Sequence, residues 1–277
     1  MSRSVRNNKF DGTGVILVPF WGVISMVMLY FSGTGNSKYI ATLFCRNTGA
    51  TCLSIEEDVD FDAQIAAVDT VAFCYPIYVS RVPRIMREFV RRHKAALRGK
   101  KVIIFCTQLL FSGDGARALT DLLPRKHVKV IYAEHFYMPN NVCNMRVLPM
   151  ASAERLQRYR ETSERKMLFI CRNIEQGKRV RRGFNPLSRI LGLPQGIFLS
   201  LVERRANRSV KIAARCTRCG LCVSICPMDN LTLDHAGITH RHNCTMCYRC
   251  INRCPHKAIT IATHGKVRDQ YRGITRG

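Results

Sequence analysis

The sequence predicts an α/β domain built on a doubly wound parallel sheet, followed by a small α+β domain that is rich in cysteine. Two observations carry this prediction. Apolar segments of strand length alternate with helical patterns through residues 26–178, which is typical of a parallel sheet covered on both faces. Eight of the 14 cysteines lie in residues 207–264 with regular spacing. A chain of 277 residues is long enough for two such domains.

The elements of the first domain follow from apolar periodicity. Strands are expected at 28–31, 52–55, 68–75, 101–106 and 128–135, with helices at 38–44, 83–93, 116–123 and 152–175. We expect the strand order 2-1-3-4-5. In such a sheet, ligands bind beyond the carboxyl ends of the strands, between the first and third strands.

A loop rich in glycine and hydroxyl groups follows the first strand directly. It reads Ser32-Gly33-Thr34-Gly35-Asn36-Ser37 and leads into a helical pattern. Glycines let the backbone approach an anion, while amides at the helix start and hydroxyls supply donors, so this pattern predicts a phosphate site. The loop lacks the lysine of a nucleoside triphosphate loop and the glycine spacing of a dinucleotide site. The alternative is an ordinary glycine-rich turn.

The third and fourth strands end where a ring attached to that phosphate would lie. Pro76 and Tyr78 follow the third strand, and their flat, partly apolar side chains suit a flavin face. Thr107 ends the fourth strand, and the loop 111–115 after it is expected to close the other side. The alternative is that the tyrosine only packs its own loop.

Two cysteine runs share one spacing, Cys-x2-Cys-x2-Cys-x3-Cys-Pro. We call Cys216–Cys226 the first cysteine run and Cys244–Cys254 the second. This spacing is typical of two [4Fe–4S] clusters, each taking its fourth thiolate from the other run. The first cluster is expected on Cys216, Cys219, Cys222 and Cys254, and the second on Cys244, Cys247, Cys250 and Cys226. A zinc ribbon also uses Cys-x2-Cys pairs, but it does not explain the third and fourth cysteines.

Charge is high and uneven. Residues 1–150 hold 19 Lys and Arg against 11 Asp and Glu, whereas residues 151–277 hold 25 against 8. This excess favours an acidic redox partner protein. No aromatic–basic pattern indicates specific nucleic-acid binding, and peripheral membrane contact is a less favoured alternative. Free thiols beside oxidation-sensitive clusters indicate the cytoplasm.

Three segments flank the two domains. Residues 1–25 form a leader of doubtful status, because the natural start is also compatible with Met26 or Met28. Residues 179–206 form a basic linker, and residues 265–277 a basic tail that is expected to be frayed.

The chain resembles the EFR1-family ferredoxins over about residues 26–264. The resemblance rests on four groups of residues: Tyr30–Ser37, Tyr75–Tyr78 with Arg81-Val82-Pro83, Met138-Pro139-Asn140-Asn141, and both cysteine runs. It implies a flavodoxin-like domain that binds FMN, fused to a ferredoxin-like domain with two [4Fe–4S] clusters. The chain departs from the family pattern at Val142 and Cys143, where an aromatic residue is common.

The leading hypothesis is an electron-transfer protein that passes electrons between FMN, the two clusters and an external redox partner. No residue is expected to act as a nucleophile or general base. One alternative is a flavin-dependent reductase of a small acceptor. Another, from a different class, is a basic iron–sulfur binding module with a vestigial flavin site.

Overall fold

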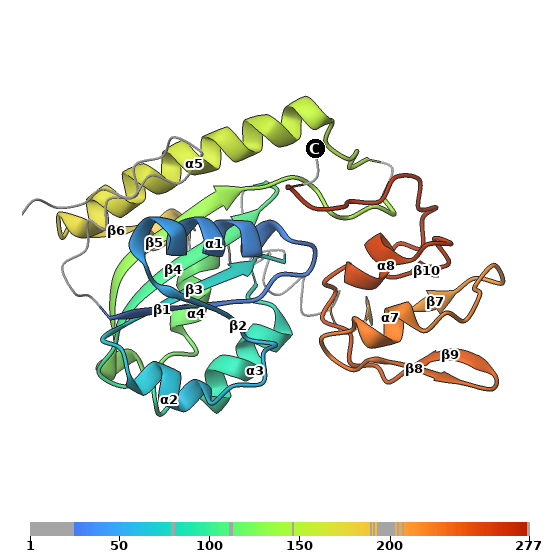
Figure 1. The fold of residues 1–277 in the computed structure, drawn as a ribbon, viewed down its shortest axis with the longest axis horizontal. Helices are drawn as coiled ribbons and strands as arrows, with labels where there is room; N and C mark the ends of the chain where they lie inside the picture. Colours follow the sequence, from blue (N-terminus) through green and yellow to red (C-terminus); the bar gives the residue numbers. More distant parts are fainter. Residues whose placement is uncertain are drawn as a thin grey trace, which may run out of the picture.

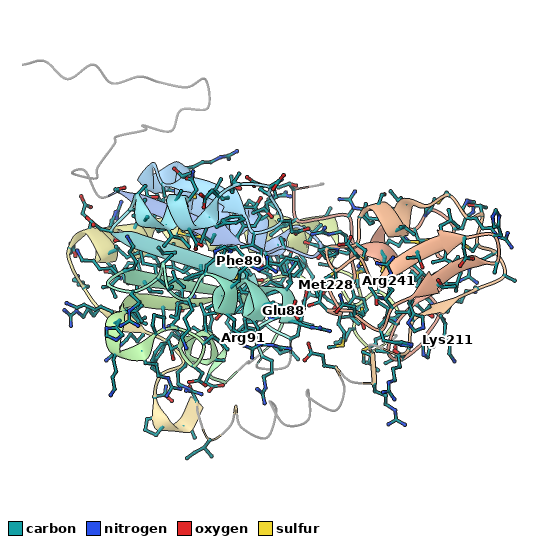
Figure 2. All side chains as sticks on the ribbon, turned by 90° about the horizontal axis from the view of Figure 1, so that it is seen from below. Glu88, Phe89, Arg91, Lys211, Met228 and Arg241 are labelled. Atoms are coloured by element: carbon teal, nitrogen blue, oxygen red, sulfur yellow. The ribbon has the colours of Figure 1, made fainter. Side chains whose placement is uncertain are left out.

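The computed structural model describes residues 25–78, 81–110, 113–145, 147–188, 190, 192, 203, 205–206 and 208–275 (Figure 1). Almost all of the predicted leader and part of the basic linker therefore lie outside the described residues. The rest forms two units that lie side by side (Figures 1 and 2). We call them the N-terminal and C-terminal domains.

A parallel sheet forms the centre of the N-terminal domain. Its order is β2-β1-β3-β4-β5-β6, so the predicted order 2-1-3-4-5 is confirmed and one short strand is added at the edge. The strands are β1 (Met26–Tyr30), β2 (Thr51–Ser54), β3 (Thr70–Pro76), β4 (Lys101–Gln108), β5 (Lys129–Tyr137) and β6 (Val180–Arg181). The added strand β6 pairs with β5 through Tyr132 and Ala133.

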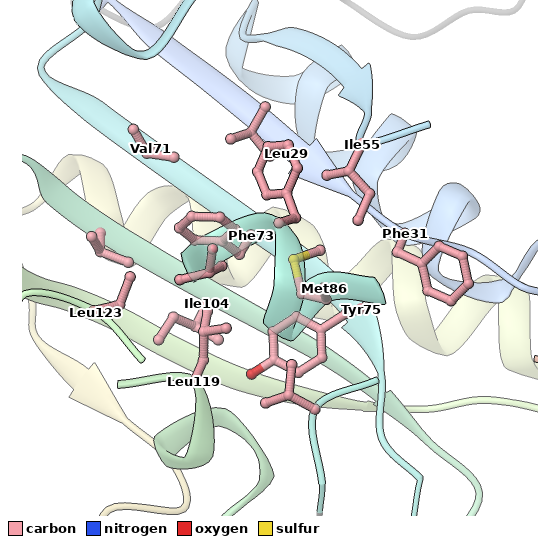
Figure 3. Close-up of a cluster of buried hydrophobic side chains, with 14 of the residues drawn as sticks. Leu29, Phe31, Ile55, Val71, Phe73, Tyr75, Met86, Ile104, Leu119 and Leu123 are labelled. Carbon is pink, nitrogen blue, oxygen red and sulfur yellow. The ribbon is translucent and has the colours of Figure 1, made fainter. Parts of the chain in front are cut away.

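Helices cover both faces of this sheet. They are α1 (Asn36–Thr48), α2 (Phe61–Ala66), α3 (Arg84–Arg92), α4 (Gly115–Thr120) and α5 (Ala153–Glu175), and a 3-10 turn, η1 (Arg125–His127), precedes β5. Side chains along each strand alternate between two cores. Leu29, Phe73 and Ile104 meet α2, α3 and α4 on one face (Figure 3). Met28, Ala72 and Ile103 meet α1 and α5 on the other face.

The short helix α2 was not predicted, because its six residues interrupt a polar stretch without a clear helical period. Its N-terminus is defined by Asp60, whose side chain accepts a hydrogen bond from the Ala63 amide at 3.0 Å. A carboxylate at this position satisfies an otherwise unpaired donor of the first turn.

The C-terminal domain consists of two small sheets and two short helices. The elements are β7 (Lys211–Ile212), α7 (Leu221–Ser224), β8 (Leu231–Asp234), β9 (Gly237–His240), α8 (Arg249–Arg253) and β10 (Ile259–Thr260). An apolar segment after each cysteine run forms a strand, β8 after the first run and β10 after the second. β8 pairs with β9, and β10 pairs with β7.

The two cysteine runs have the same backbone, offset by 28 positions. Left-handed residues recur as Arg218 (φ 56) and Met246 (φ 55), as Gly220 (φ 72) and Tyr248 (φ 60), and as Asp229 (φ 47) and Lys257 (φ 50). Each run therefore makes the same turns before α7 or α8, with the same three cysteines around each bend. Tyr248 adopts a conformation that glycine prefers, and such strain is retained where the side chain is used.

The predicted fraying of the tail is wrong for the described residues up to 275. Val267, Tyr271 and Ile274 are buried, and Ile274 lies in the core between the sheet and helices α1 and α5. The Tyr271 hydroxyl donates to Asn36 Oδ1 at 2.5 Å, and Arg160 donates to the Ile274 carbonyl at 2.8 Å. The tail therefore returns to the N-terminal domain. The prediction failed because it rested on the high charge of the tail and overlooked three apolar side chains, which are the ones that become buried.

Within the described part of the chain, no helix combines the length and apolar character that crossing a membrane requires.

Replacing Ile274 by alanine should lower the free energy of unfolding by about 3 kcal/mol, because a fully buried side chain leaves a cavity. The matched control is Leu168→Ala on α5, where the side chain is 48% exposed and a change within about 0.5 kcal/mol is expected. Anaerobic thermal or denaturant unfolding of both variants measures this. Equal stability of the two variants would mean that the tail is not packed.

Candidate cofactor sites

A cavity of about 540 Å³ lies at the carboxyl ends of β1, β3 and β4. We call it the strand-end cavity. Eight of the nine residues predicted to bind the flavin line it: Ser32, Gly33, Thr34, Asn36, Ser37, Pro76, Tyr78 and Thr107. The ninth, Gly35, is the N-cap of α1 and faces a neighbouring cleft. The structure therefore brings the ends of three strands together at one site of ligand size.

The start of α1 offers an anion site beside this cavity. Gly35 has φ 108, a left-handed conformation that permits the tight turn from the strand into the helix. The first turn of α1 contains no acidic residue. Amides in the first turn of a helix have no intrahelical acceptor, and the helix dipole favours a negative charge there. This end of the cavity suits a phosphate group.

Hydroxyl groups hold the loop in shape. Ser32 Oγ accepts a hydrogen bond from the Gly35 amide at 3.1 Å. Ser37 Oγ lies 2.8 Å from Thr107 Oγ1, which ties the start of α1 to the end of β4. Asn141 donates to Thr34 Oγ1 at 2.9 Å, and Asn36 donates to the Pro139 carbonyl at 3.0 Å. The loop is therefore held in its conformation by hydrogen bonds within the protein, to the end of β4 and to the segment 139–141.

Tyr78, in the wall of this cavity, provides an unused polar atom. Among the described residues, its buried hydroxyl is one of the few side-chain polar atoms without a hydrogen-bond partner. Burial raises the pKa of Tyr78 well above its ordinary value, and the nearby Cys247 and Cys244 thiols act in the same direction. The hydroxyl therefore stays protonated and able to donate. A buried donor of this kind is expensive unless a ligand accepts from it.

The loop after β4 only partly meets expectation. Gln108 and Leu109 line the strand-end cavity. Gly113 and Asp114, which were expected near the ring, instead pack against Gly192. Residues 111 and 112 lie outside the described residues. The Asp114 carboxylate, which is buried and paired with Arg117 at the start of α4, lies beside Gly192.

The C-terminal domain closes the strand-end cavity, a contact that was not predicted from the sequence. Met246, Tyr248, Ala262 and Thr263 complete its wall. A signal for this was available in the sequence, because Met246 and Tyr248 replace the Arg218 and Gly220 of the first cysteine run. Apolar side chains at these two positions distinguish the run that faces the cavity from the run that faces solvent.

Gly33 and Cys247 form a close backbone contact between the two domains. A Cβ atom at Gly33 would collide with the carbonyl oxygen of Cys247, so only glycine allows this contact. Cys247 is a predicted cluster ligand. The loop predicted to hold phosphate therefore touches a loop predicted to hold iron.

Arg249 stabilises this contact between the loop Ser32–Ser37 and the second cysteine run. Its guanidinium donates to the carbonyl oxygens of Ser32 at 2.9 Å, of Gly33 at 3.2 Å and of Ile225 at 3.2 Å. It also forms a bidentate pair with Glu56, at 2.6 and 2.7 Å. Burial lowers the pKa of Arg249, but the hydrogen bonds and charge of Glu56 outweigh this and raise it above its usual value. The side chain is therefore a permanent cation at the domain boundary.

The eight predicted cluster ligands are divided between two further cavities. Cys216, Cys219, Cys222 and Cys254 line one, and Cys226, Cys244, Cys247 and Cys250 line the other. These are the two sets expected from the exchange of the fourth cysteine between the runs. We call the sites cluster site I and cluster site II. Among the described residues, no group of three or more His, Cys, Asp or Glu side chains is arranged to hold a single metal ion.

Backbone amides point at the cysteine sulfurs with the same twofold relation. The amide of Asn230 donates to Cys226 Sγ at 3.3 Å, and that of Ala258 donates to Cys254 Sγ at 3.2 Å. Such N–H···S bonds stabilise thiolates and influence cluster potential. Burial raises the pKa of Cys247 to about 11, so iron has to displace the proton when it binds.

The fold and these sites define a class of protein: a two-domain α/β and α+β chain with a strand-end cavity suited to a phosphate group beside two cysteine-lined sites. Three solved structures are reported as similar to it. A Megasphaera elsdenii flavodoxin shares 22% identity, with 52% of this chain and 98% of that chain covered and a TM-score of 0.36. An archaeal flavodoxin shares 14%, with 55% and 99% covered and a TM-score of 0.38. An NAD(P)H:quinone oxidoreductase from Methanothermobacter marburgensis shares 16%, with 54% and 96% covered and a TM-score of 0.38.

No curated protein sequence matches the chain. Family models match both domains, a flavodoxin domain at residues 27–180 and a 4Fe-4S dicluster domain at residues 202–259. The chain belongs to the flavodoxin domain family. The predicted architecture, a flavodoxin domain followed by a two-cluster ferredoxin domain, is thus confirmed, and its cofactors are FMN and two [4Fe–4S] clusters.

Replacing Arg249 by glutamine should raise the dissociation constant of FMN about tenfold, a change of about 1.4 kcal/mol. The reason is that Arg249 positions the loop that holds the phosphate, while iron content should stay unchanged. Fluorescence titration of flavin-depleted protein with FMN and an iron assay measure this. The control is Arg241→Gln at the exposed end of β9 (Figure 2). Equal FMN affinity of the two variants would contradict the role of Arg249.

Replacing Tyr78 by phenylalanine should weaken FMN binding about fivefold, since one hydrogen bond to the ligand contributes about 1 kcal/mol. Tyr75→Phe is the control, because the Tyr75 hydroxyl donates to the Gly115 carbonyl at 3.1 Å inside the core. That variant should lose stability without losing FMN affinity. The same fluorescence titration with FMN measures both variants. Unchanged FMN affinity in Tyr78→Phe would show that the Tyr78 hydroxyl does not contact the ligand.

Proposed function

We propose that this chain is an electron-transfer protein that passes electrons between FMN in the strand-end cavity, the two clusters and an external redox partner. The observation that supports the proposal is that the strand-end cavity and cluster site II have a lining residue in common. Tyr248 lines both the strand-end cavity and cluster site II. The contact of Gly33 with Cys247 lies beside it. A cavity for FMN and a cluster site with one side chain in common are suited to direct electron exchange.

Bound FMN exchanges up to two electrons and each cluster exchanges one, so their combination connects two-electron and one-electron redox reactions. The protein residues supply position and surroundings. Ser32–Ser37 hold the phosphate end, Tyr78 offers a donor at the ring end, and Met246 and Tyr248 exclude water between the two sites. The arrangement requires no nucleophile or general base.

The order of the sites supports a linear route. Cluster site II adjoins the strand-end cavity through Tyr248, and cluster site I shares Leu221 with an open cleft. Electrons would therefore pass between FMN and cluster II, and then between cluster II and cluster I.

Free thiols elsewhere in the chain and oxygen-sensitive clusters suit the reducing cytoplasm, which we propose as the compartment of this protein.

Laser-flash reduction of bound FMN under anaerobic conditions tests this proposal. The cluster absorbance should bleach as the flavin is reoxidised, at a rate independent of protein concentration. A protein that contains both cofactors and shows no such bleaching would contradict the proposal. Repeated turnover of a quinone would instead identify a reductase.

The variant Thr34→Val with Asn36→Ala should lose FMN, because Thr34 and Asn36 hold the loop through Asn141, Pro139 and Tyr271. It should keep its iron, and dithionite should still reduce its clusters, but the flash should produce no internal transfer. The matched control is Thr42→Val with Asn47→Ala, further along the same helix. Retained FMN in the first variant would exclude the loop as the phosphate site.

A further inference from the structure

Cluster site I is the end of the cofactor series that faces solvent. Cys219 is exposed, whereas the other seven cluster cysteines are buried or half-buried. Cluster site II is enclosed by Met246, Tyr248 and Arg249 against the N-terminal domain. An external protein that exchanges electrons with this chain therefore has its closest access at Cys219.

The internal twofold relation identifies the surface that such a protein would contact. Met246, Tyr248 and Arg249 bind the second cysteine run to the N-terminal domain. Their equivalents in the first run, 28 positions earlier, are Arg218, Gly220 and Leu221. In the first run these residues are exposed or half-exposed, and Leu221 lines the open cleft that the C-terminal domain shares with Ser32 and Gly33 of the N-terminal domain. The fold thus packs one cluster face against the flavodoxin domain and leaves the equivalent face of the other cluster accessible from solvent.

The exposed face combines an apolar centre with a basic rim. Leu221 and Leu233 are 38% and 44% exposed, and they are the large apolar side chains exposed in the described part of the C-terminal domain. Leu233 also lies next to Gly220, at 3.8 Å from the position of a Cβ atom there. Single exposed leucines are common on protein surfaces, but two of them beside an exposed, predicted cluster ligand form an apolar patch that a partner protein could cover.

Two exposed arginines lie on this face. Arg218 is exposed and donates to the His235 carbonyl at 3.0 Å. Arg253 is exposed and lines the cleft of about 1040 Å³ that reaches Leu221 and Ile225. The Glu56 carboxylate in that cleft is paired with Arg249. The face formed by Arg218, Cys219, Leu221, Leu233 and Arg253 is therefore apolar and positive. We call it the docking face.

We propose that the docking face binds a small acidic redox protein that exchanges one electron at a time with cluster I. The proposal rests on the proposed electron-transfer function. In each transfer, one electron leaves the iron of the reduced partner and one is gained by the iron of the other, and no bond is formed or broken. Complementary charge speeds encounter and fixes orientation, and the leucines supply desolvated contact.

Binding of an acidic plant-type [2Fe–2S] ferredoxin, measured by anaerobic calorimetry with both proteins oxidised, tests the proposal. Replacing Arg218 and Arg253 by glutamine should weaken binding about tenfold and reduce its dependence on salt. Leu233→Ala should weaken it about threefold. Basic cytochrome c, used as the mismatched probe, should not bind more weakly to these variants than to the wild type.

The matched control replaces Lys126 and Lys129 by glutamine. These exposed lysines lie before and at the start of β5, in the N-terminal domain and at the amino end of a strand, so the same change of charge should leave ferredoxin binding within about twofold. Equal weakening in both double variants would mean that only net charge matters, and it would overturn the proposal. Wild-type affinity in the Arg218 and Arg253 variant would overturn it as well.

Flash reduction separates this result from the proposed function. The Arg218 and Arg253 variant should keep the iron and flavin content of the wild type and the same internal transfer rate. Absence of internal transfer in the wild type would refute the proposed function whatever the binding result. Normal internal transfer with unchanged ferredoxin binding would refute the docking face alone.

Discussion

The contact between the second cysteine run and the loop Ser32–Ser37 is the constraint on which both cofactor sites depend. Arg249 accounts for the orientation of that loop. It donates to the carbonyl oxygens of Ser32 and Gly33, so the following amides, across trans peptide bonds, point away from Arg249. Those amides belong to Gly33 and Thr34, which line the strand-end cavity. One cation from the ferredoxin domain thus arranges donors for a phosphate in the flavodoxin domain, and Glu56 keeps that cation in place.

The same contact explains why the two halves of the ferredoxin domain differ although their backbones agree. Both runs read Cys-Thr-x-Cys-x-x-Cys, and they diverge at Arg218 and Met246, at Gly220 and Tyr248, and at Leu221 and Arg249. Each residue of the second run at these positions contacts the other domain or the shared cavity. Each residue of the first run is exposed or half-exposed. Tyr248 even keeps a left-handed conformation to place its ring between the two sites. The two runs therefore differ in sequence at the positions where only the second run contacts the N-terminal domain.

Local patterns were sufficient to predict most of the fold. Strand length, helical period and the cysteine spacing are properties of neighbouring residues, so the sheet order, the place of the loop Ser32–Ser37 and the grouping of the eight cysteines into two sets of four followed from the sequence. Contacts between distant segments did not. Cys143 is buried in the core of the ferredoxin domain, and the Asn144 side chain donates to the Ile261 carbonyl at 2.8 Å. Ile274 fills a core 94 or more positions away from its partners on the sheet and on α5. No period or spacing encodes such pairings, which only the folded chain brings together.

A cavity closed by both domains couples the cofactors to each other. Met246 and Tyr248 are held in place by the bends of the second cysteine run, and iron holds that run through Cys244, Cys247 and Cys250 once the cluster is bound. A ligand that binds only the closed arrangement stabilises that arrangement by its own binding free energy. FMN held in the strand-end cavity would therefore favour the docked ferredoxin domain, and a loaded cluster site II would favour FMN to the same extent, because such coupling is reciprocal. The wall that would bring FMN and cluster II close together would thus also make their assembly cooperative.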